Sequence, residues 1–418
     1  MRADRTDRHR FAARIAPARA GSGIAALIAI VLAAGCSAAG QSTGQGPTTG
    51  GASSTGSTPT TSKATTPPPT KAAQILIPQA GGAPINPKAP IVVSTAAGKL
   101  TSVTVTNAKG LHVTGDFSAD NTRWSSNEDL GYGKSYQVVA VGSAEGKTMH
   151  KTGTVKVLAP RKTAYPSVIP PPGANDVGVG QPLVVRFDQT VNKVIAQKTL
   201  KVTSSPSQPG AWYWVTPTQV DYRPPQFWAP GTKITLQITD YGVDLGNGIY
   251  GETDRTLPIS IHDSWIAKPD GNTHQMGIYH NGAEVKTMPI SLGKPATPTH
   301  IGTHVIQSKY KKYVMRSCSF GLCGAGSYVA NEYYAERISN DGEFVHENPL
   351  SVGDQGSANV SHGCINLNEA NAIWFFGHFG LGDVVDVSNS GGAVLPVSDT
   401  YGDWALPWSV WSLGNAGS

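Results

Sequence analysis

Short runs in which apolar and polar residues alternate, separated by glycine-containing turns, recur along most of this chain. The segments 102–105, 136–141 and 234–238 are examples. Alternation with a period of two is typical of strands that bury one face. The 418 residues also include 48 glycines and 30 prolines, which supply turns and interrupt helices. We therefore expect a mainly β protein with three folded units.

The first two units are predicted to be immunoglobulin-like β-sandwich domains, residues 76–160 and 161–261. Neither contains a cysteine, so no disulfide joins their sheets. The second domain is rich in tryptophan. We expect these side chains to lie in the core or at an interface, with carbohydrate stacking as the alternative; they are Trp212, Trp214 and Trp228.

The third unit, residues 262–388, is predicted to be β-rich and to contain one helix. It opens with a hairpin around the turn His280-Asn281-Gly282. The helix is expected over residues 368–377, where the apolar positions should face a sheet: Ala372, Ile373, Phe375 and Phe376.

The N-terminus indicates export. Residues 1–36 begin with six arginines and two aspartates, continue with the apolar run 24–34 and end in a lipobox-like Ala33-Ala34-Gly35-Cys36. The apolar run is short for a membrane span. We predict a signal peptide whose removal leaves a lipid-modified Cys36 on the outer face of the cytoplasmic membrane, with an ordinary secretory peptide as the alternative.

Residues 37–75 are almost entirely Ser, Thr, Gly, Ala, Gln and Pro, a composition that cannot bury a core. We predict a disordered linker that tethers the folded part to the membrane, with a root-mean-square span of roughly 30–40 Å for a flexible coil.

The basic character of the chain belongs to the predicted signal peptide. The whole sequence has 33 basic and 28 acidic side chains, and removing residues 1–35 leaves 27 and 26, a net charge of +1. The mature protein therefore offers no electrostatic case for nucleic-acid binding.

One thiol lies in a setting that favours chemistry. Cys364 stands in Ser361-His362-Gly363-Cys364-Ile365-Asn366, and His346 precedes this run by fourteen intervening residues. An imidazole near a thiol accepts its proton and stabilises the thiolate as a nucleophile. Gly363 lacks a Cβ, so a tight turn there should direct the Gly363 and Cys364 amides at an oxyanion.

This pattern resembles the signature of the L,D-transpeptidases, which cross-link bacterial peptidoglycan. The resemblance implies that Cys364 is the nucleophile and His346 its base, with His362, Gly363, Ser361 and Asn366 shaping the site. Family members often carry serine where this chain has Glu347. That position supplies a backbone carbonyl to the imidazole, so only a hydroxyl role is put in doubt.

The resemblance extends over about residues 164–418. The second sandwich is similar to the module beside the catalytic domain in actinobacterial members, through 178–182, Arg223-Pro224 and 241–246. In related proteins a C-terminal segment like 389–418 packs back between the domains. We favour this fold-back over a membrane or wall anchor for the three tail tryptophans, Trp404, Trp408 and Trp411.

By the same resemblance, residues 312–337 form a lid rich in aromatic residues, enough to exclude water from a thioester. Met315 and Tyr328 match positions that line the donor pocket in the family, with ordinary loop packing as the alternative. Cys318 and Cys323 lie in this segment, and an oxidising compartment favours a disulfide between them over two free thiols.

The implied function is a 3→3 cross-link formed through a thioester on Cys364, with release of D-alanine from a tetrapeptide stem. The implied partners are donor and acceptor stem peptides, and carbapenem-type β-lactams as covalent inhibitors. Neither a metal nor an organic cofactor is needed. The alternatives are a hydrolytic L,D-carboxypeptidase, a non-enzymatic wall-binding protein, and a zinc site at His346, His362 and Cys364 that lacks the usual ligand spacing.

Overall fold

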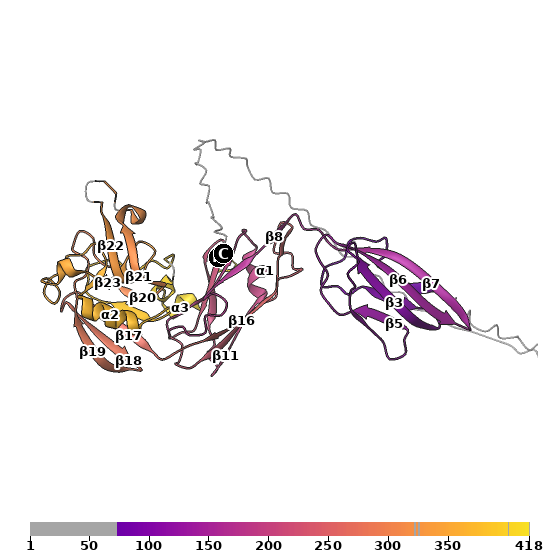
Figure 1. Ribbon diagram of the computed structural model, residues 1–418, viewed down its shortest axis with the longest axis horizontal. Coiled ribbons are helices and arrows are strands. Elements are labelled where there is room, and N and C mark those ends of the chain that lie inside the picture. Colours follow the sequence, from indigo (N-terminus) through magenta and orange to yellow (C-terminus); the bar gives the residue numbers. More distant parts are fainter. Residues whose placement is uncertain (1–72, 322, 325–326, 400, 418) are drawn as a thin grey trace, which may run out of the picture. The chain divides into compact units, whose positions relative to one another are not determined.

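The computed structural model describes residues 73–321, 323–324, 327–399 and 401–417 (Figure 1). Most of the regular structure there is strand, which confirms the predicted mainly β class. The predicted signal peptide, Cys36 and linker residues 37–72 lie outside the described residues. The prediction that the linker extends to residue 75 is wrong, because Ile75 is a buried residue of the first strand, Ile75–Leu76. Within those residues, no helix combines the length and the apolar content that crossing a membrane requires. The α-helices described are α1 (Lys193–Lys198), α2 (Glu369–His378) and α3 (Trp408–Trp411).

The first sandwich consists of two antiparallel sheets. One has the order β1-β2-β5-β4, formed by Ile75–Leu76, Val92–Thr95, Arg123–Ser126 and Gly115–Phe117. The other has the order β3-β6-β7, formed by Lys99–Asn107, Ser135–Ala144 and Lys147–Lys156. Strand β6 buries alternate residues, among them Tyr136, Val138 and Ala140. The alternation in the sequence is thus the direct cause of the sandwich core.

The second sandwich pairs a four-stranded with a three-stranded sheet. The first has the order β12-β13-β10-β9, formed by Ala211–Thr216, Gln219–Arg223, Leu183–Phe187 and Pro166–Ile169. The second has the order β11-β14-β16, formed by Leu200–Ser205, Lys233–Ile238 and Arg255–Ser260. A short parallel pair, β8 (Lys162–Ala164) and β15 (Ile249–Gly251), completes it.

The tryptophans of this sandwich are core residues, as predicted. Trp214 and Trp228 are almost fully buried, and Trp212 packs against the Tyr222 ring at 5.0 Å between centroids. Their surfaces are therefore taken up by packing within the protein.

The third domain is built from two sheets and helix α2. One sheet has the order β19-β18-β17-β25-β20, formed by Ala283–Pro289, Gln275–His280, Trp265–Asp270, Val384–Val387 and Gly302–Val305. The other has the order β21-β22-β23-β24, formed by Ser308–Arg316, Val329–Arg337, Phe344–Glu347 and Ile365–Leu367. In Figure 1, α2 lies between β23 and β17, and one hydrophobic core joins residues of both sheets and the helix. The predicted hairpin is β18–β19, closed by Asn281 and Gly282, both with positive φ.

Helix α2 begins after Asn368, whose side chain accepts a hydrogen bond from the Asn371 N–H. Its buried stripe consists of Ala372 and Phe375, continued by Phe379 just past its end. The prediction that Ile373 also faces the sheet is wrong, because Ile373 is 46% exposed. It lies about 100° around the helix from Ala372, which turns it towards solvent.

The predicted lid is a β-hairpin. Strands β21 and β22 pair along their length, and a 3-10 turn, Ser317–Phe320, begins their connection. Tyr313 and Phe320 pack with Met315 and Phe344, so part of the expected aromatic cover exists. Tyr333 does not contribute, because it is 44% exposed on the opposite face of β22.

Cys318 and Cys323 form a disulfide in this connection. Replacing both with alanine should lower the free energy of unfolding by about 2 kcal/mol at most, because the closed loop is very short. Urea unfolding measures this difference, and reductant should reduce it to zero. Intact mass after reduction and alkylation tests the bond itself. An oxidised protein whose two cysteines already react with the alkylating agent would contradict it.

The C-terminal segment packs on the second sandwich. The Trp404 and Trp411 indoles donate hydrogen bonds to the carbonyls of Gly180 and Ala211, each at 2.9 Å. The Arg223 guanidinium carbon lies 4.7 Å from the Trp404 ring centre and 4.5 Å from that of Trp411. Because Arg223 is buried, these rings shield its charge from solvent.

Candidate active site

Parallel pairing of two short strands brings the candidate base to the candidate nucleophile. His346 on β23 pairs with Asn366 on β24, and Cys364 immediately precedes β24. Such a pairing requires a long connection, here residues 348–364, which contain the 3-10 turn Pro349–Ser351. The fourteen-residue spacing read from the sequence is therefore largely the connection that lets the two strands run parallel.

The predicted residues gather around one cavity of about 450 Å³. Its lining includes Cys364, His346, His362, Ser361, Asn366, Met315 and Tyr328. Of the residues predicted for this site, only Gly363 does not line the cavity. The carboxylates of Glu332 and Asp354 also line it.

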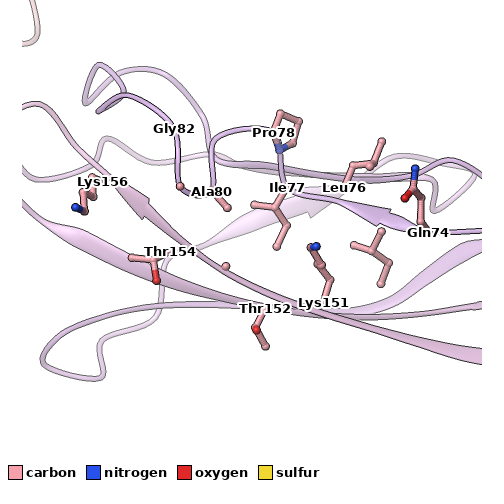
Figure 2. A pocket seen from close by; sticks show the side chains of 13 residues that line it. Gln74, Leu76, Ile77, Pro78, Ala80, Gly82, Lys151, Thr152, Thr154 and Lys156 are labelled. Carbon is pink, nitrogen blue, oxygen red and sulfur yellow. The ribbon is translucent and has the colours of Figure 1, made fainter.

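A larger cavity of about 810 Å³ lies in the first sandwich (Figure 2). Segment 74–82 forms one side, and β7 supplies Lys151, Thr152, Thr154 and Lys156 on the other. Its lining contains neither cysteine nor histidine, so it lacks the thiol and imidazole pair that the sequence predicts. The smaller cavity around Cys364 is therefore the candidate active site.

The turn before Cys364 depends on Gly363 and Ser361. Gly363 has a φ of +123°, a backbone conformation that side chains disfavour, and this explains the glycine. The Ser361 hydroxyl donates to the Cys364 carbonyl at 2.6 Å and accepts from the Gly363 N–H at 3.1 Å. The expectation that both the Gly363 and Cys364 amides face an oxyanion is therefore wrong for Gly363, whose N–H is already bonded. The Cys364 N–H remains for that role.

Cys364 is buried, at 5% exposure, within a cluster that includes Met315 and Phe344. Its thiol donates to the Gly342 carbonyl at 3.6 Å. His346 lines the same cavity. The candidate nucleophile thus sits in an apolar setting beside the candidate base.

His346 is held through Nδ1 by two oxygens. The Glu347 carbonyl lies 2.6 Å away, so the carbonyl expected at this position is present although serine is replaced. The Glu332 carboxylate Oε2 lies 3.1 Å away. Burial lowers the pKa of His346, but hydrogen bonds and charges from Cys364 and Glu332 outweigh it and raise the pKa to about 10. The imidazole therefore favours its protonated form, and Nε2 is left for the thiol.

Met315 and Tyr328 face each other beside the thiol. The Tyr328 hydroxyl donates to the Met315 sulfur at 3.4 Å. Burial, with the charges of Cys364 and Glu332, raises the pKa of Tyr328 to about 12. Tyr328 therefore keeps its proton at neutral pH, and this proton is donated to Met315 in the absence of a ligand.

His362 lines the cavity but interacts with Lys294. Its Nε2 accepts from the Lys294 ammonium at 3.0 Å, and its ring lies 5.4 Å from that of Tyr328. Burial and the Lys294 charge lower the pKa of His362, which keeps the ring neutral. Asn366 donates to the Ser351 hydroxyl at 3.1 Å and so supports the connecting loop.

Sequence reasoning missed Glu332, Asp354 and Lys294. Glu332 stands fourteen residues before His346, outside the motif, and Lys294 lies in a different sheet connection. No local pattern marks them, because Glu332 and Asp354 reach the cavity, and Lys294 reaches His362, only through the tertiary fold. Only the alternation of Tyr328, Ala330 and Glu332 along one strand could have suggested a shared face.

A group that could hold a cation lies elsewhere. In the described part of the chain, His300, Asp341 and Glu343 present ligand atoms within 4.8 Å of one another. Both Glu343 oxygens already accept hydrogen bonds, from His300 at 3.0 Å and His304 at 3.1 Å. Burial raises the pKa of Glu343, but the hydrogen bonds outweigh this effect and lower the pKa to about 2. The group is therefore satisfied internally.

Comparison with family models identifies two regions. Residues 82–244 match the bacterial Ig domain, and residues 266–387 match the L,D-transpeptidase catalytic domain. The second match contains both His346 and Cys364.

Comparison with known proteins gives extensive similarity. L,D-transpeptidase 2 of Mycobacterium tuberculosis is 39% identical over 83% of this chain and 87% of its own length. L,D-transpeptidase 5 of the same species is 31% identical over 82% of this chain and 77% of its own. An L,D-transpeptidase solved in complex with imipenem is 32% identical, covering 55% of this chain and all of its own, with a TM-score of 0.48.

Proposed function

The chain belongs to the L,D-transpeptidase family, and we propose that it forms 3→3 cross-links in peptidoglycan through a thioester on Cys364. The family is one of enzymes. The observation that carries the proposal is that the buried side chains of Cys364 and His346 line one cavity large enough for a peptide stem.

The reaction proceeds in two steps. The Cys364 thiolate attacks the carbonyl of the diamino acid at position three of a donor stem, and the carbon–nitrogen bond to the terminal D-alanine breaks. The His346 imidazolium gives its proton to the leaving amine. An amine of a neighbouring stem then attacks the thioester, transfers its proton to His346 and releases the thiolate. No electron transfer occurs, so the residues present suffice for the chemistry.

Carbapenem-type β-lactams should acylate the same thiol. Their strained amide presents a carbonyl to the nucleophile as the donor stem does. A relative of this chain was solved in complex with imipenem. Met315 and Tyr328 supply the apolar wall and the hydroxyl donor that would hold either acyl donor against Cys364.

Mass spectrometry of the muropeptide products tests the proposal. Purified protein with disaccharide tetrapeptide should yield dimers joined between two position-three residues, with one D-alanine released per bond. Tripeptide monomers without dimers would instead identify a hydrolytic L,D-carboxypeptidase. Wild-type protein that gives neither product would overturn the proposal.

We further propose that the enzyme is a lipoprotein held on the outer face of the cytoplasmic membrane. The arginine-rich start, the apolar run and the lipobox-like end at Cys36 support this location. The composition of residues 37–72 supports a spacer between membrane and wall.

Cys36→Ala should release the protein from the membrane fraction, because the lipid acceptor is lost, while imipenem acylation of purified protein stays unchanged. Ser37→Ala is the matched control and should remain in the membrane fraction. Deletion of residues 37–72 should lower 3→3 cross-links in cells without changing acylation in solution. If the deletion impaired acylation by the purified enzyme, the segment would be part of the catalytic structure and not a tether.

A further inference from the structure

One carboxylate at the candidate active site has no part in the mechanism above. Glu332 on β22 lies with Oε2 3.1 Å from His346 Nδ1, and its side chain is only 14% exposed. We propose that Glu332 is a positioning residue that completes a Cys364–His346–Glu332 triad and holds the proton on the imidazole. This inference rests on the thioester chemistry proposed above.

The geometry of strand β22 places Glu332 at the cavity. Tyr328, Ala330 and Glu332 are two residues apart and all line it, as the period of a strand requires. Pairing of Tyr333 with Glu347 sets this end of β22 beside the residue that follows His346. A β-bulge follows directly, between Tyr333 and Glu336, and Tyr334 within it has a φ of +49°. Bulges of this kind redirect side chains next to active sites.

The chemistry of the imidazole explains what a carboxylate adds. Nδ1 carries one proton, and the Glu347 carbonyl at 2.6 Å is enough to orient the ring. A carboxylate adds a full negative charge in a nearly dry site, where opposite charges attract more strongly than in water. It therefore favours the ring that carries protons on both nitrogens. The proton passes from the Cys364 sulfur to His346 Nε2 and then to the leaving amine nitrogen, while Glu332 takes no part in the transfer.

Few other charged groups face the ring. The Glu347 carboxylate comes from the same strand as His346. Burial and the charges of Glu369 and Glu332 raise the pKa of Glu347, and the His346 charge opposes this shift. From the turn before β24 comes Cys364. The other titratable groups of the cavity are Tyr328, Asp354 and His362. Within the described residues, Glu332 alone brings a carboxylate within hydrogen-bond distance of the ring.

A titration of His346 by NMR tests the contact without substrate. In the Cys364→Ala background the thiol no longer affects the ring, so Glu332→Gln removes the remaining close charge while conserving shape. We expect the His346 titration to move down by about one to three pH units. Asp354→Asn is the matched control, because it removes a carboxylate from the same cavity without contacting the ring. A shift in E332Q no larger than that in D354N would overturn the proposal.

The pH dependence of imipenem acylation gives the functional readout in the otherwise native protein. Loss of the His346 proton sets the alkaline limb, so Glu332→Gln should move this limb to lower pH. A uniform loss of rate with both limbs unchanged is the result of a merely structural role and would refute the triad.

Two further comparisons keep the test decisive. If E332Q does not fold, Glu332→Asp retains the charge one methylene further back and should move the NMR titration down by a smaller amount; an absent shift counts against the proposal. The NMR result does not depend on the reaction catalysed. A shifted titration in a protein that forms no cross-link would overturn the proposed function and leave the role of Glu332 standing.

Discussion

Cys364→Ala is expected to abolish both cross-linking and acylation by imipenem, down to the background of the uncatalysed reactions. The proposed thioester forms on the Cys364 sulfur, and an alanine side chain cannot form it. Because Cys364 is small and already sits in an apolar cluster with Met315, Ala335 and Phe344, alanine should leave the fold intact. Intact mass after incubation with imipenem measures the adduct, and circular dichroism measures the fold.

The matched control removes cysteines elsewhere in the domain. The Cys318→Ala/Cys323→Ala protein lacks the disulfide but keeps Cys364, so it should still gain the mass of one imipenem adduct. Detection of an adduct on folded C364A would mean that another group is the nucleophile, and the assignment would fall.

His346→Ala should be nearly as severe, with acylation slowed by roughly 10²–10⁴-fold, the usual contribution of a positioned general base. The raised pKa of His346, about 10, means that the ring keeps the proton it takes from the thiol across the neutral range. Without the ring the thiol must lose its proton to water. The pH profile of iodoacetamide alkylation of Cys364 should therefore move to higher pH.

His362→Ala separates the two histidines of the cavity. The His362 ring is engaged by Lys294, so its removal should leave the alkylation profile close to that of the wild type. An unchanged profile in His346→Ala would show that His346 is not the base. A shift of the alkylation profile in His362→Ala as large as that in His346→Ala would mean that His346 is not the specific acceptor of the thiol proton.

Much of the fold could be predicted from local patterns in the sequence. Alternation in 136–141 predicted strand β6, and Asn281-Gly282 predicted the hairpin turn, because both depend on residues adjacent in the chain. The helix α2 was also predictable in extent. The buried face of α2 was not predictable. Both Ala372 and Ile373 are apolar, and only the position of the sheet decides that Ala372 is buried and Ile373 exposed.

The sequence by itself determined that Cys364, His346 and the glycine turn belong to one site, because these lie in one continuous segment whose spacing the parallel strands β23 and β24 impose. It also indicated Met315 and Tyr328 through resemblance. Only the tertiary structure decided that the Gly363 amide is bonded to Ser361, that His362 turns to Lys294, and that Glu332 reaches His346. These contacts join strands and loops distant along the chain. A side chain's partner there is set by strand register and by a bulge, which a local pattern of residue types does not encode.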